Sequence, residues 1–339
     1  MSHLYPLQLQ PELHKRVWGA RSLHPIYPQE VITEPVGEAW LTGDQCRVAN
    51  GPLAGRTLDE LSREFGAELL GEAAPDRERF PLLLKFLFPV DKLSVQVHPD
   101  DETAAREGEP CGKTECWYVL QAVPGAQIGL GLKPGVTRHE VESAIRETRM
   151  EQLLNWTHLH PGDLIYVEAG TVHTIGPGAI LLEIQQNSDT TYRLYDYGRP
   201  RELHIDAGLK AVKESTHSGK VEKRQPLADK GKSQVNLVTS PCFVVDKFSV
   251  SRPWEFRRPQ QARRSVWCLV GLRGAGKISS DNSEPISFNC GTAVVVPASV
   301  EKLIVKPEPD LEFLCASLPI EKVEHPKTVL VENIATVAQ

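Results

Sequence analysis

The chain has 339 residues, of which 40% are hydrophobic and 24% charged, and its formal net charge is −6. This composition is typical of a folded protein with about two domains and argues against a disordered chain. The negative charge gives no indication of a nucleic acid or an anionic membrane as partner, and no apolar run approaches the ~20 residues of a membrane span.

The first residues of the chain lack a charged segment followed by an apolar one, so no signal peptide is predicted. The seven cysteines are scattered, and none forms a Cys-x-x-Cys pair. Cys242, Cys268 and Cys315 lie in apolar runs. We therefore expect buried, reduced thiols and a cytoplasmic protein.

Most periodic segments indicate short strands separated by Gly and Pro turns. The predicted strands are Leu82–Phe88, Leu93–His98, Cys116–Leu120, Leu164–Val167 and Ala179–Gln185.

Helices are predicted at three places. Thr57-x-x-Glu60 and Thr137-x-x-Glu140 have the pattern of a capping box, which predicts one helix after Thr57 and another from Arg138 to about Asn155. A third helix is predicted over residues 205–212, and the polar stretch 214–232 indicates a linker.

The strand at residues 93–98 carries an unusual row of polar side chains. Ser94, Gln96 and His98 share one face, because side chains alternate along a strand. If that face is buried, it needs a polar partner; a half-exposed strand with a polar outer face is the alternative. With Glu115 and His173 the row supplies two His, one Glu and an amide, a common ligand set for catalytic zinc.

An internal repeat is also visible. Trp117-Tyr-Val-Leu matches Trp267-Cys-Leu-Val, and the strand after Gly162 matches the strand after Gly291. Two copies of one barrel, with a helical insertion in the first, account for both matches; chance similarity of glycine-bounded strands is the alternative. In this alignment Ser265 takes the place of Glu115 and Lys302 that of His173, so the second copy is expected to bind no metal.

The order His98, Glu115, then a Gly-Asp strand ending in Gly-x-x-His173 is the ligand order of a cupin barrel. Together with the runs 85–98, 112–115, 169–173 and 183–196, it resembles a type I mannose-6-phosphate isomerase of the short bacterial kind, over roughly residues 10–215. The resemblance implies an all-β fold with helical insertions, formed by two cupin (jelly-roll) β-barrels. The catalytic barrel would span residues 1–232, and a second barrel without metal would span residues 233–339.

The resemblance also implies a reaction: the zinc-dependent interconversion of mannose 6-phosphate and fructose 6-phosphate through an enediol. One Zn²⁺ per chain would be held by Gln96, His98, Glu115 and His173. The catalytic residues would be Glu38, Lys85, Lys113 and Arg193, and the substrate-binding residues would be Trp18, Ser94 and Arg199, with Ser94 and Arg199 as phosphate candidates.

For three of these residues a purely structural role is the alternative. Lys85 lies in an apolar strand, where an ammonium needs a partner unless it snorkels to the surface. Lys113 fits a surface turn as well as a metal-facing position, and Arg193 fits a structural partner of Asp189 or Asp196.

Two other functions remain open at this point. One is an iron-dependent cupin oxygenase, because the ligands alone do not fix the metal. The other is a non-catalytic sugar-phosphate-binding protein with a structural zinc. The expected partner is a small sugar phosphate, and neither a nucleic acid nor a membrane is expected; the base and the oligomeric state are not predicted.

Overall fold

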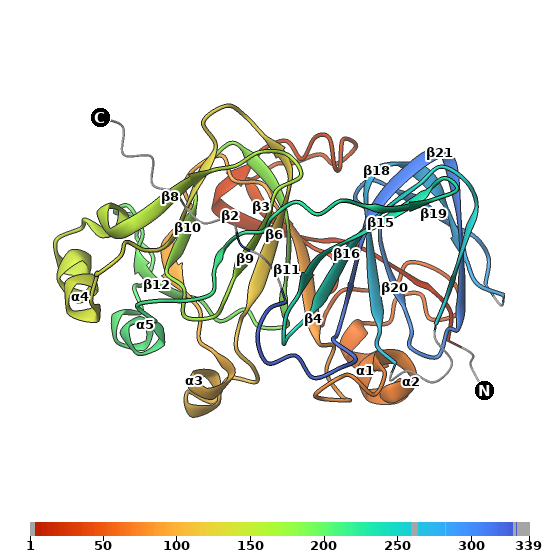
Figure 1. The fold of residues 1–339 in the computed structure, drawn as a ribbon, viewed down its shortest axis with the longest axis horizontal. Helices are drawn as coiled ribbons and strands as arrows, with labels where there is room; N and C mark the ends of the chain where they lie inside the picture. Colours follow the sequence, from red (N-terminus) through yellow and green to blue (C-terminus); the bar gives the residue numbers. More distant parts are fainter. Residues whose placement is uncertain (1–3, 259–263, 282, 328–329, 331–339) are drawn as a thin grey trace.

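The computed structural model describes residues 4–258, 264–281, 283–327 and 330, and its strands form three sheets (Figure 1). In sheet order, the seven-stranded sheet consists of β13 (Gly219–Lys220), β9 (Leu164–Val167), β6 (Glu115–Ala122), β11 (Ala179–Gln186), β4 (Leu82–Leu87), β3 (Val36–Trp40) and β2 (Glu12–Ala20). The five-stranded sheet consists of β12 (Tyr192–Tyr195), β5 (Val95–Val97), β10 (His173–Ile175), β7 (Gln127–Leu132) and β8 (Leu154–His158).

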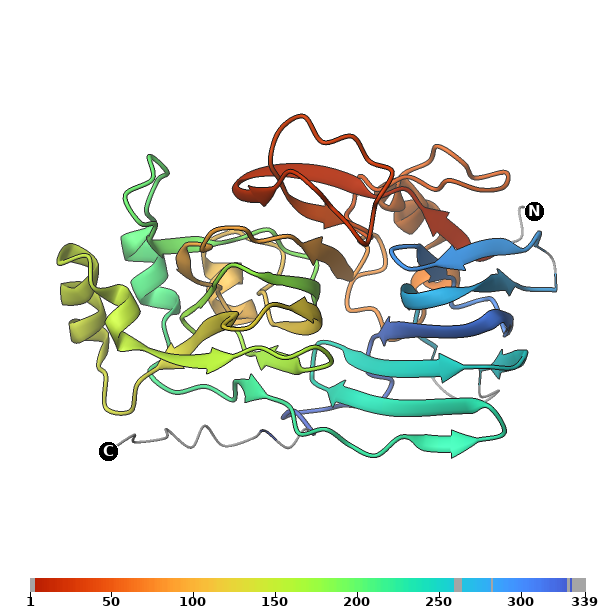
Figure 2. The ribbon, with the colours of Figure 1, turned by 90° about the horizontal axis from the view of Figure 1, so that it is seen from above.

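The nine-stranded sheet contains most of the last third of the chain and lies beside the other two (Figure 2). Its main path is β1 (Leu7–Leu9), β20 (Ala293–Val296), β18 (Trp267–Ser279), β21 (Lys302–Ser317), β16 (Val244–Val250), β15 (Lys232–Thr239) and β14 (Leu227–Asp229). β17 (Trp254–Arg257) pairs with β21, and β19 (Ile286–Asn289) pairs with β18. The mostly-β, cupin-type fold is thereby confirmed, although each sheet is an open path of strands over the described residues.

The helices are short and lie outside the sheets: α1 (Leu58–Phe65), α2 (Ala67–Leu70), α3 (Asp101–Arg106), α4 (Arg138–Arg146) and α5 (Ile205–Ala211). Both predicted capping boxes are present, since the side chains of Thr57 and Thr137 accept hydrogen bonds from the backbone N–H groups of Glu60 and Glu140. None of the helices in the described residues is long and apolar enough to cross a membrane.

The predicted helix 138–155 is wrong in its second half. α4 ends at Arg146, and Thr148 adopts a positive φ of 55° that reverses the chain. A 3₁₀ turn, η1 (Met150–Leu153), then leads into β8, which pairs with β7. The predicted linker is also partly ordered, because it contains β13 and β14. All seven cysteines carry free thiols. The predicted burial holds for Cys268 and Cys315 but is wrong for Cys242, which is only partly buried in the turn before β16.

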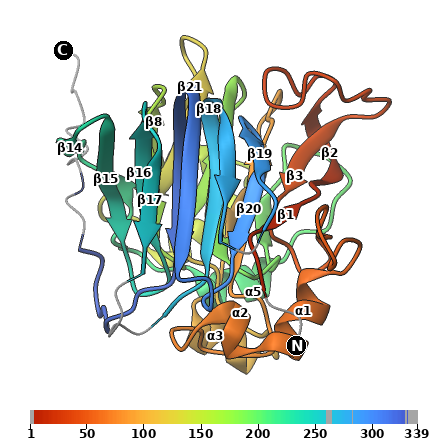
Figure 3. The same ribbon diagram turned by 90° about the vertical axis from the view of Figure 1, so that its right-hand side faces the viewer.

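The strand order confirms the internal repeat. The order β9-β6-β11-β4-β3-β2 reappears as β20-β18-β21-β16-β15-β14, and β5-β10-β7-β8 reappears as β17-β21-β18-β19, with β18 and β21 each replacing two strands. β13 pairs with β9 at one edge, and β1 from the N-terminus pairs with β20 at the equivalent edge (Figure 3). The sheet formed by the last third of the chain therefore depends on a strand from its beginning.

The pairing register corrects the alignment of the two copies near Glu115. Glu115 lies opposite Val167, whereas the residue opposite Val296 in the second copy is Trp267. Trp267 therefore takes the place of Glu115, two residues after the expected Ser265.

The alignment also shifts at His173. His173 lies opposite Gln96, and the corresponding inward-facing pair in the second copy is Leu303 opposite Phe256. Leu303 occupies this inward-facing position, one residue after the expected Lys302, although the turns after β9 and β20 have the same length of five residues.

A continuous hydrophobic core joins the seven-stranded sheet to the nine-stranded sheet. Buried residues on the facing strands include Cys116, Tyr118, Leu182, Ile184, Cys268, Val270, Val295, Leu314 and Ala316. The opposite face of the seven-stranded sheet looks toward the five-stranded sheet. It carries the charged side chains of Lys85, Glu115 and Glu183, all buried.

Candidate active site

Three buried side chains of metal-ligating type converge between the seven- and five-stranded sheets. Nε2 of His98 lies 3.6 Å from one carboxylate oxygen of Glu115, and Nε2 of His173 lies 3.4 Å from the other. Their candidate ligand atoms all lie within 4.8 Å of one another. Within the described part of the chain, no other group of three His, Cys, Asp or Glu side chains comes together in this way.

The strand pairing explains how this cluster forms. His98 follows β5, Glu115 begins β6 and His173 begins β10. Gln96 lies opposite His173 across the β5–β10 ladder, and its Nε2 is 3.2 Å from Nε2 of His173. The structure thus brings together all four residues that the sequence analysis assigned to the metal.

The hydrogen bonds of the two imidazoles suit a metal ion. Nδ1 of His98 lies 2.9 Å from the carbonyl oxygen of Thr190, and Nδ1 of His173 lies 2.9 Å from that of Thr171. A carbonyl can only accept, so each Nδ1 carries the proton and each Nε2 presents a lone pair to the cluster. Nε2 of His98 and both carboxylate oxygens of Glu115 are buried without a hydrogen-bond partner, a costly arrangement that a cation would relieve.

The pKa shifts of the three side chains also suit a metal ion. Burial, reinforced by the charge of Lys113, lowers the pKa of His98 well below its usual value. Burial lowers the pKa of His173 to about 4. Burial and the negative charge of Glu183 raise the pKa of Glu115 well above its usual value. Neutral imidazoles and a carboxylate that lacks a sufficient counter-charge fit a divalent cation.

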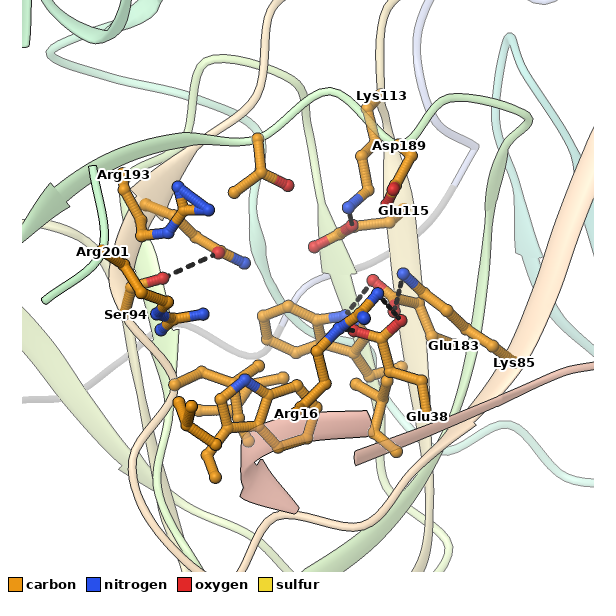
Figure 4. Close-up of a pocket in the computed structure, with 18 of the residues that line it drawn as sticks. Arg16, Glu38, Lys85, Ser94, Lys113, Glu115, Glu183, Asp189, Arg193 and Arg201 are labelled. Atoms are coloured by element: carbon orange, nitrogen blue, oxygen red, sulfur yellow. Dashed lines mark hydrogen bonds and ion pairs between the residues drawn. The ribbon is translucent and has the colours of Figure 1, made fainter. Parts of the chain in front are cut away.

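A cavity of about 420 Å³ opens in front of the cluster (Figure 4). It brings together all the predicted catalytic residues and most of the predicted substrate-binding ones: Trp18, Glu38, Lys85, Ser94, Lys113 and Arg193, beside Gln96 and Glu115. Arg193, Arg201 and Ser94 lie on one side of the cavity, and Glu38, Lys85 and Glu183 lie on the other (Figure 4). Arg199 is not among the lining residues.

Lys85 is an ion-paired residue and not a snorkelling one. Its Nζ lies 3.1 Å from Glu183, with both side chains almost fully buried. The two residues are direct neighbours across the β4–β11 ladder. Burial alone would lower the pKa of Lys85, but the charges of Glu183 and Glu38 outweigh it and raise that pKa. The ammonium is therefore held charged at the cavity wall.

Glu38 is anchored by a second set of charges. Nε and Nη2 of Arg16 donate to its two oxygens at 3.0 and 2.9 Å, and Nε1 of Trp40 donates at 2.7 Å. Burial raises the pKa of Glu38, but Lys85 and Arg16 outweigh it, and the net shift is downward. Glu38 is therefore a fixed anion beside Lys85.

Lys113 is buried, which excludes the surface alternative. Its Nζ lies 3.4 Å from the Glu115 carboxylate, and its backbone N–H donates to the carbonyl of Pro99. Its ammonium therefore lies beside Glu115 at the cavity wall.

Three arginines in or near the cavity differ in the groups that they bind. Nη1 of Arg193 donates to the carbonyl of Glu202 at 3.2 Å, and no carboxylate of the described residues pairs with it. The structural pairing with Asp189 or Asp196 is thus not seen. Arg199 is occupied by Asp91 and Asp196, at 2.7 and 3.1 Å.

Arg201 also binds Asp196, through two hydrogen bonds of 2.7 Å, but it does line the cavity. The phosphate candidate Arg199 therefore lies outside the cavity wall, and the arginine two residues later lies in it. The turn after β12 decides this, and no periodic pattern marks it.

Sequence analysis also missed Arg16, Glu183 and Asp189, which all line the cavity. For Glu183 a signal existed, because inward-facing residues alternate along β11 and Glu183 comes opposite Lys85. Asp189 has no ion-pair partner among the described residues, whereas Glu38, Glu115 and Glu183 each have one.

Two facing antiparallel sheets that enclose a His–Glu–His cluster and a charged cavity define a cupin-type protein with a candidate metal centre. Residues 7–118 match the family model "Phosphomannose isomerase type I, catalytic domain". A probable mannose-6-phosphate isomerase from Bacillus subtilis is 35% identical over 308 residues, 87% of this chain and 94% of the relative. The mannose-6-phosphate isomerase of Streptococcus mutans is 39% identical over 315 residues, 87% of this chain and 93% of the relative.

The crystal structure of a mannose 6-phosphate isomerase from Bacillus subtilis has the same fold, with a TM-score of 0.82 and 30% sequence identity. The match covers 92% of this chain and 99% of that one. The chain belongs to the type I phosphomannose isomerase family.

The geometry predicts that Glu115→Ala and His173→Ala each lose the bound metal. Both residues lie on strands that also bury apolar faces, so the variants should stay folded. Metal per chain after dialysis, measured by mass spectrometry, should be about one equivalent in the parent and close to none in either variant. His158→Ala, an exposed histidine on β8, should keep its metal. Full metal content in either ligand variant would show that the cluster is not the site.

Proposed function

We propose that the protein is a zinc-dependent aldose–ketose isomerase that interconverts mannose 6-phosphate and fructose 6-phosphate through an enediol. The observation that carries the proposal is the set of unsatisfied acceptor atoms on His98 and Glu115. Glu115 and the neighbouring Gln96 line a cavity that also contains several basic side chains. Relatives that share most of their length with this chain carry the name of that enzyme. Family membership argues against the oxygenase and the non-catalytic binding protein.

We propose Zn²⁺ as the metal, one ion per chain, held by His98, Glu115 and His173 with the Gln96 amide or water. Two imidazoles and one carboxylate are suitable zinc ligands. When bound, the ion would act as a Lewis acid that polarises the substrate carbonyl.

The cavity side chains supply the rest of the chemistry. The guanidinium of Arg193, which pairs with no carboxylate of the described residues, is placed to stabilise the oxyanion that develops on the sugar. Asp189, the cavity carboxylate without an ion-pair partner, moves the proton between the two neighbouring carbons. Lys85 and Lys113, fixed by Glu183 and Glu115, supply positive charge without changing position, and Glu38 holds Lys85. Trp18 is buried in the cavity wall and excludes water.

The phosphate group is assigned to Arg201 and Ser94. Both line the same side of the cavity (Figure 4), and a guanidinium binds phosphate well through paired N–H donors. Arg201 takes the role expected of Arg199 because Arg201 lines the cavity, although it also binds Asp196, whereas Arg199 does not line it.

We also propose that residues 1–232 form the catalytic unit, except for β1 and β14, which belong to the nine-stranded sheet, and that residues 233–339 carry no metal. The cluster lies wholly between residues 98 and 173, and Trp267 and Leu303 replace two ligands in the second copy. The last nine residues of the second unit lie outside the described residues. The free thiols support a cytoplasmic location.

The function is tested by an isomerase assay on several hexose 6-phosphates before and after metal removal. Turnover of mannose 6-phosphate should exceed that of the other aldose phosphates, should disappear after chelation, and should return with added Zn²⁺. Circular dichroism of the chelated protein should show that the sheets persist. Undiminished turnover in the chelated, metal-free protein would exclude zinc dependence.

The chemical step is tested with Arg193→Ala and Asp189→Asn. Both should lower kcat with little change in KM, because each group acts on the transition state more than on the bound sugar. For Arg193 the loss should be about 10²- to 10³-fold, the usual effect of removing one oxyanion donor. Asp206→Asn, on α5 and outside the cavity wall, should be unchanged. A normal kcat with a large KM would move either residue to a binding role.

The phosphate assignment is tested by comparing Arg201→Ala with Arg199→Ala. Both arginines bind Asp196, so the two variants disturb the same carboxylate. Arg201→Ala should raise KM by roughly 10- to 100-fold, because a hydrogen bond to a charged group contributes about 1.5–3 kcal/mol. Arg199→Ala should leave KM near the parent value. The reverse pattern would return the phosphate to Arg199.

A further inference from the structure

One buried guanidinium in the nine-stranded sheet has no acidic partner. Arg258 follows β17 and is 9% exposed. Its side chain donates to the carbonyl groups of Val300 at 2.9 Å, Ser265 at 2.5 Å, Pro297 at 3.1 Å and Val296 at 3.3 Å. No Asp or Glu of the described residues forms an ion pair with it, so a full positive charge is held by backbone dipoles.

An aromatic ring completes its surroundings. The guanidinium carbon lies 3.7 Å from the centre of the Trp267 ring, within the range of a cation–π contact. Burial lowers the pKa of Arg258 to about 10, so the side chain stays charged at neutral pH. The cost of burying that charge is therefore met by four carbonyl groups and one indole.

Arg258 occupies the position in the second copy of the repeat that corresponds to His98 in the first copy. Phe256 corresponds to Gln96, because each lies opposite the first inward-facing residue after the equivalent turn. The next inward-facing residue is His98 in the first copy and Arg258 in the second. Trp267, on which Arg258 stacks, corresponds to Glu115.

The contact between Arg258 and Trp267 thus replaces the contact between His98 and Glu115. The four positions that hold Gln96, His98, Glu115 and His173 in the first copy hold Phe256, Arg258, Trp267 and Leu303 in the second. None of these four can ligate a cation while Arg258 is charged.

The backbone that Arg258 binds also joins the two halves of the molecule. The N–H of Val266, next to Ser265, donates to the carbonyl of Leu70 in α2 at 2.9 Å. The N–H groups of Ala298 and Ser299 donate to the carbonyls of Leu69 and Glu68, also at 2.9 Å. Arg258 lies behind both segments and bonds to each of them.

Gly71 shows how closely the segments approach. A Cβ on Gly71 would lie 2.3 Å from the carbonyl oxygen of Arg264, so the chain after α2 runs directly against the segment that precedes Val266. There is no room for this backbone to shift without losing the contact. A residue that fixes the far side of the segment therefore acts on the junction itself.

We infer that Arg258 is a built-in cation at the place in the second copy that corresponds to the metal position of the first, and that it clamps the two backbone segments that dock onto α2. A metal ion joins strand ends through ligands and leaves room for a substrate. The guanidinium joins them through carbonyl groups and leaves no open position. This inference depends on the strand pairing and not on the isomerase activity.

The inference is tested by removing the guanidinium with Arg258→Ala and then adding methylguanidinium to the variant. Arg258→Ala should lower the Tm by about 5–10 °C, since several charge-assisted bonds are lost together. Methylguanidinium at millimolar concentration should fill the vacated space and raise the Tm of this variant by several degrees. The matched control is Arg257→Ala, the adjacent exposed arginine, which should show neither effect. Metal content should stay at the parent value in both variants.

Two results would overturn the inference. One is a Tm for Arg258→Ala within a degree of the parent; the other is a methylguanidinium effect equal in the two variants. If Arg258→Ala does not fold, Arg258→Lys decides the question. An ammonium on a straight chain cannot reach all the carbonyl groups that the planar fork reaches, so Arg258→Lys should also lose several degrees. A lysine variant as stable as the parent would show that no clamp exists.

Discussion

The buried carboxylate of Glu115 is the constraint on which the site depends. It has no exposed surface and no hydrogen-bond partner, and the nearest ammonium, on Lys113, is 3.4 Å away. A buried carboxylate is very unfavourable unless it is paired and hydrogen-bonded, and Lys113 supplies the pairing without a hydrogen bond. The neighbours of Glu115 on the other side are two imidazoles that burial keeps neutral, and their lone pairs face the same point. A cation among the three groups would stabilise this arrangement, which is why the cluster is a candidate metal centre.

From Glu115 outward, the cavity alternates in charge: Lys113 faces Glu115, Lys85 faces Glu183, and Arg16 faces Glu38. Strand pairing enforces this order, because Lys85 and Glu183 are direct neighbours across β4 and β11. Each fixed pair leaves the cavity close to neutral at that point. Six basic and four acidic residues line the cavity. This surplus of positive charge, in a chain of net charge −6, explains how a phosphorylated sugar could be attracted to this site and not to the surface at large.

Features with a local physical cause could be predicted from the sequence. The capping boxes at Thr57 and Thr137 form as expected, because they depend on four consecutive residues. The four residues of the candidate metal centre were also predicted. Gln96 and His98 stood out because a row of polar side chains on a buried strand requires a polar partner, whereas Glu115 and His173 came from motifs that resemble a known family. Features that depend on the path of the chain through turns could not be predicted from the sequence. The choice of Arg201 over Arg199 rests on the path of the chain after β12, and the end of α4 rests on the positive φ of Thr148. The repeat was visible, but its register was off by two residues at Trp267 and by one at Leu303. Similar apolar strands align equally well in several registers until hydrogen bonding chooses one.

The two copies show how one strand arrangement can serve either chemistry or architecture. In both, the ends of β5 or β17 and the turn after β9 or β20 meet at one place, and in both that place suits a positive charge. In the first copy the groups around it are side chains with lone pairs, so the charge would come from a bound cation. In the second copy the groups are backbone carbonyls and an indole, and the charge comes from Arg258 itself. Because a guanidinium cannot exchange ligands, the second copy gives up any open position. Instead, the backbone segments that Arg258 binds form a fixed surface that holds α2 through hydrogen bonds. The next element along the chain after α2 is β4, the strand that places Lys85 in the cavity wall.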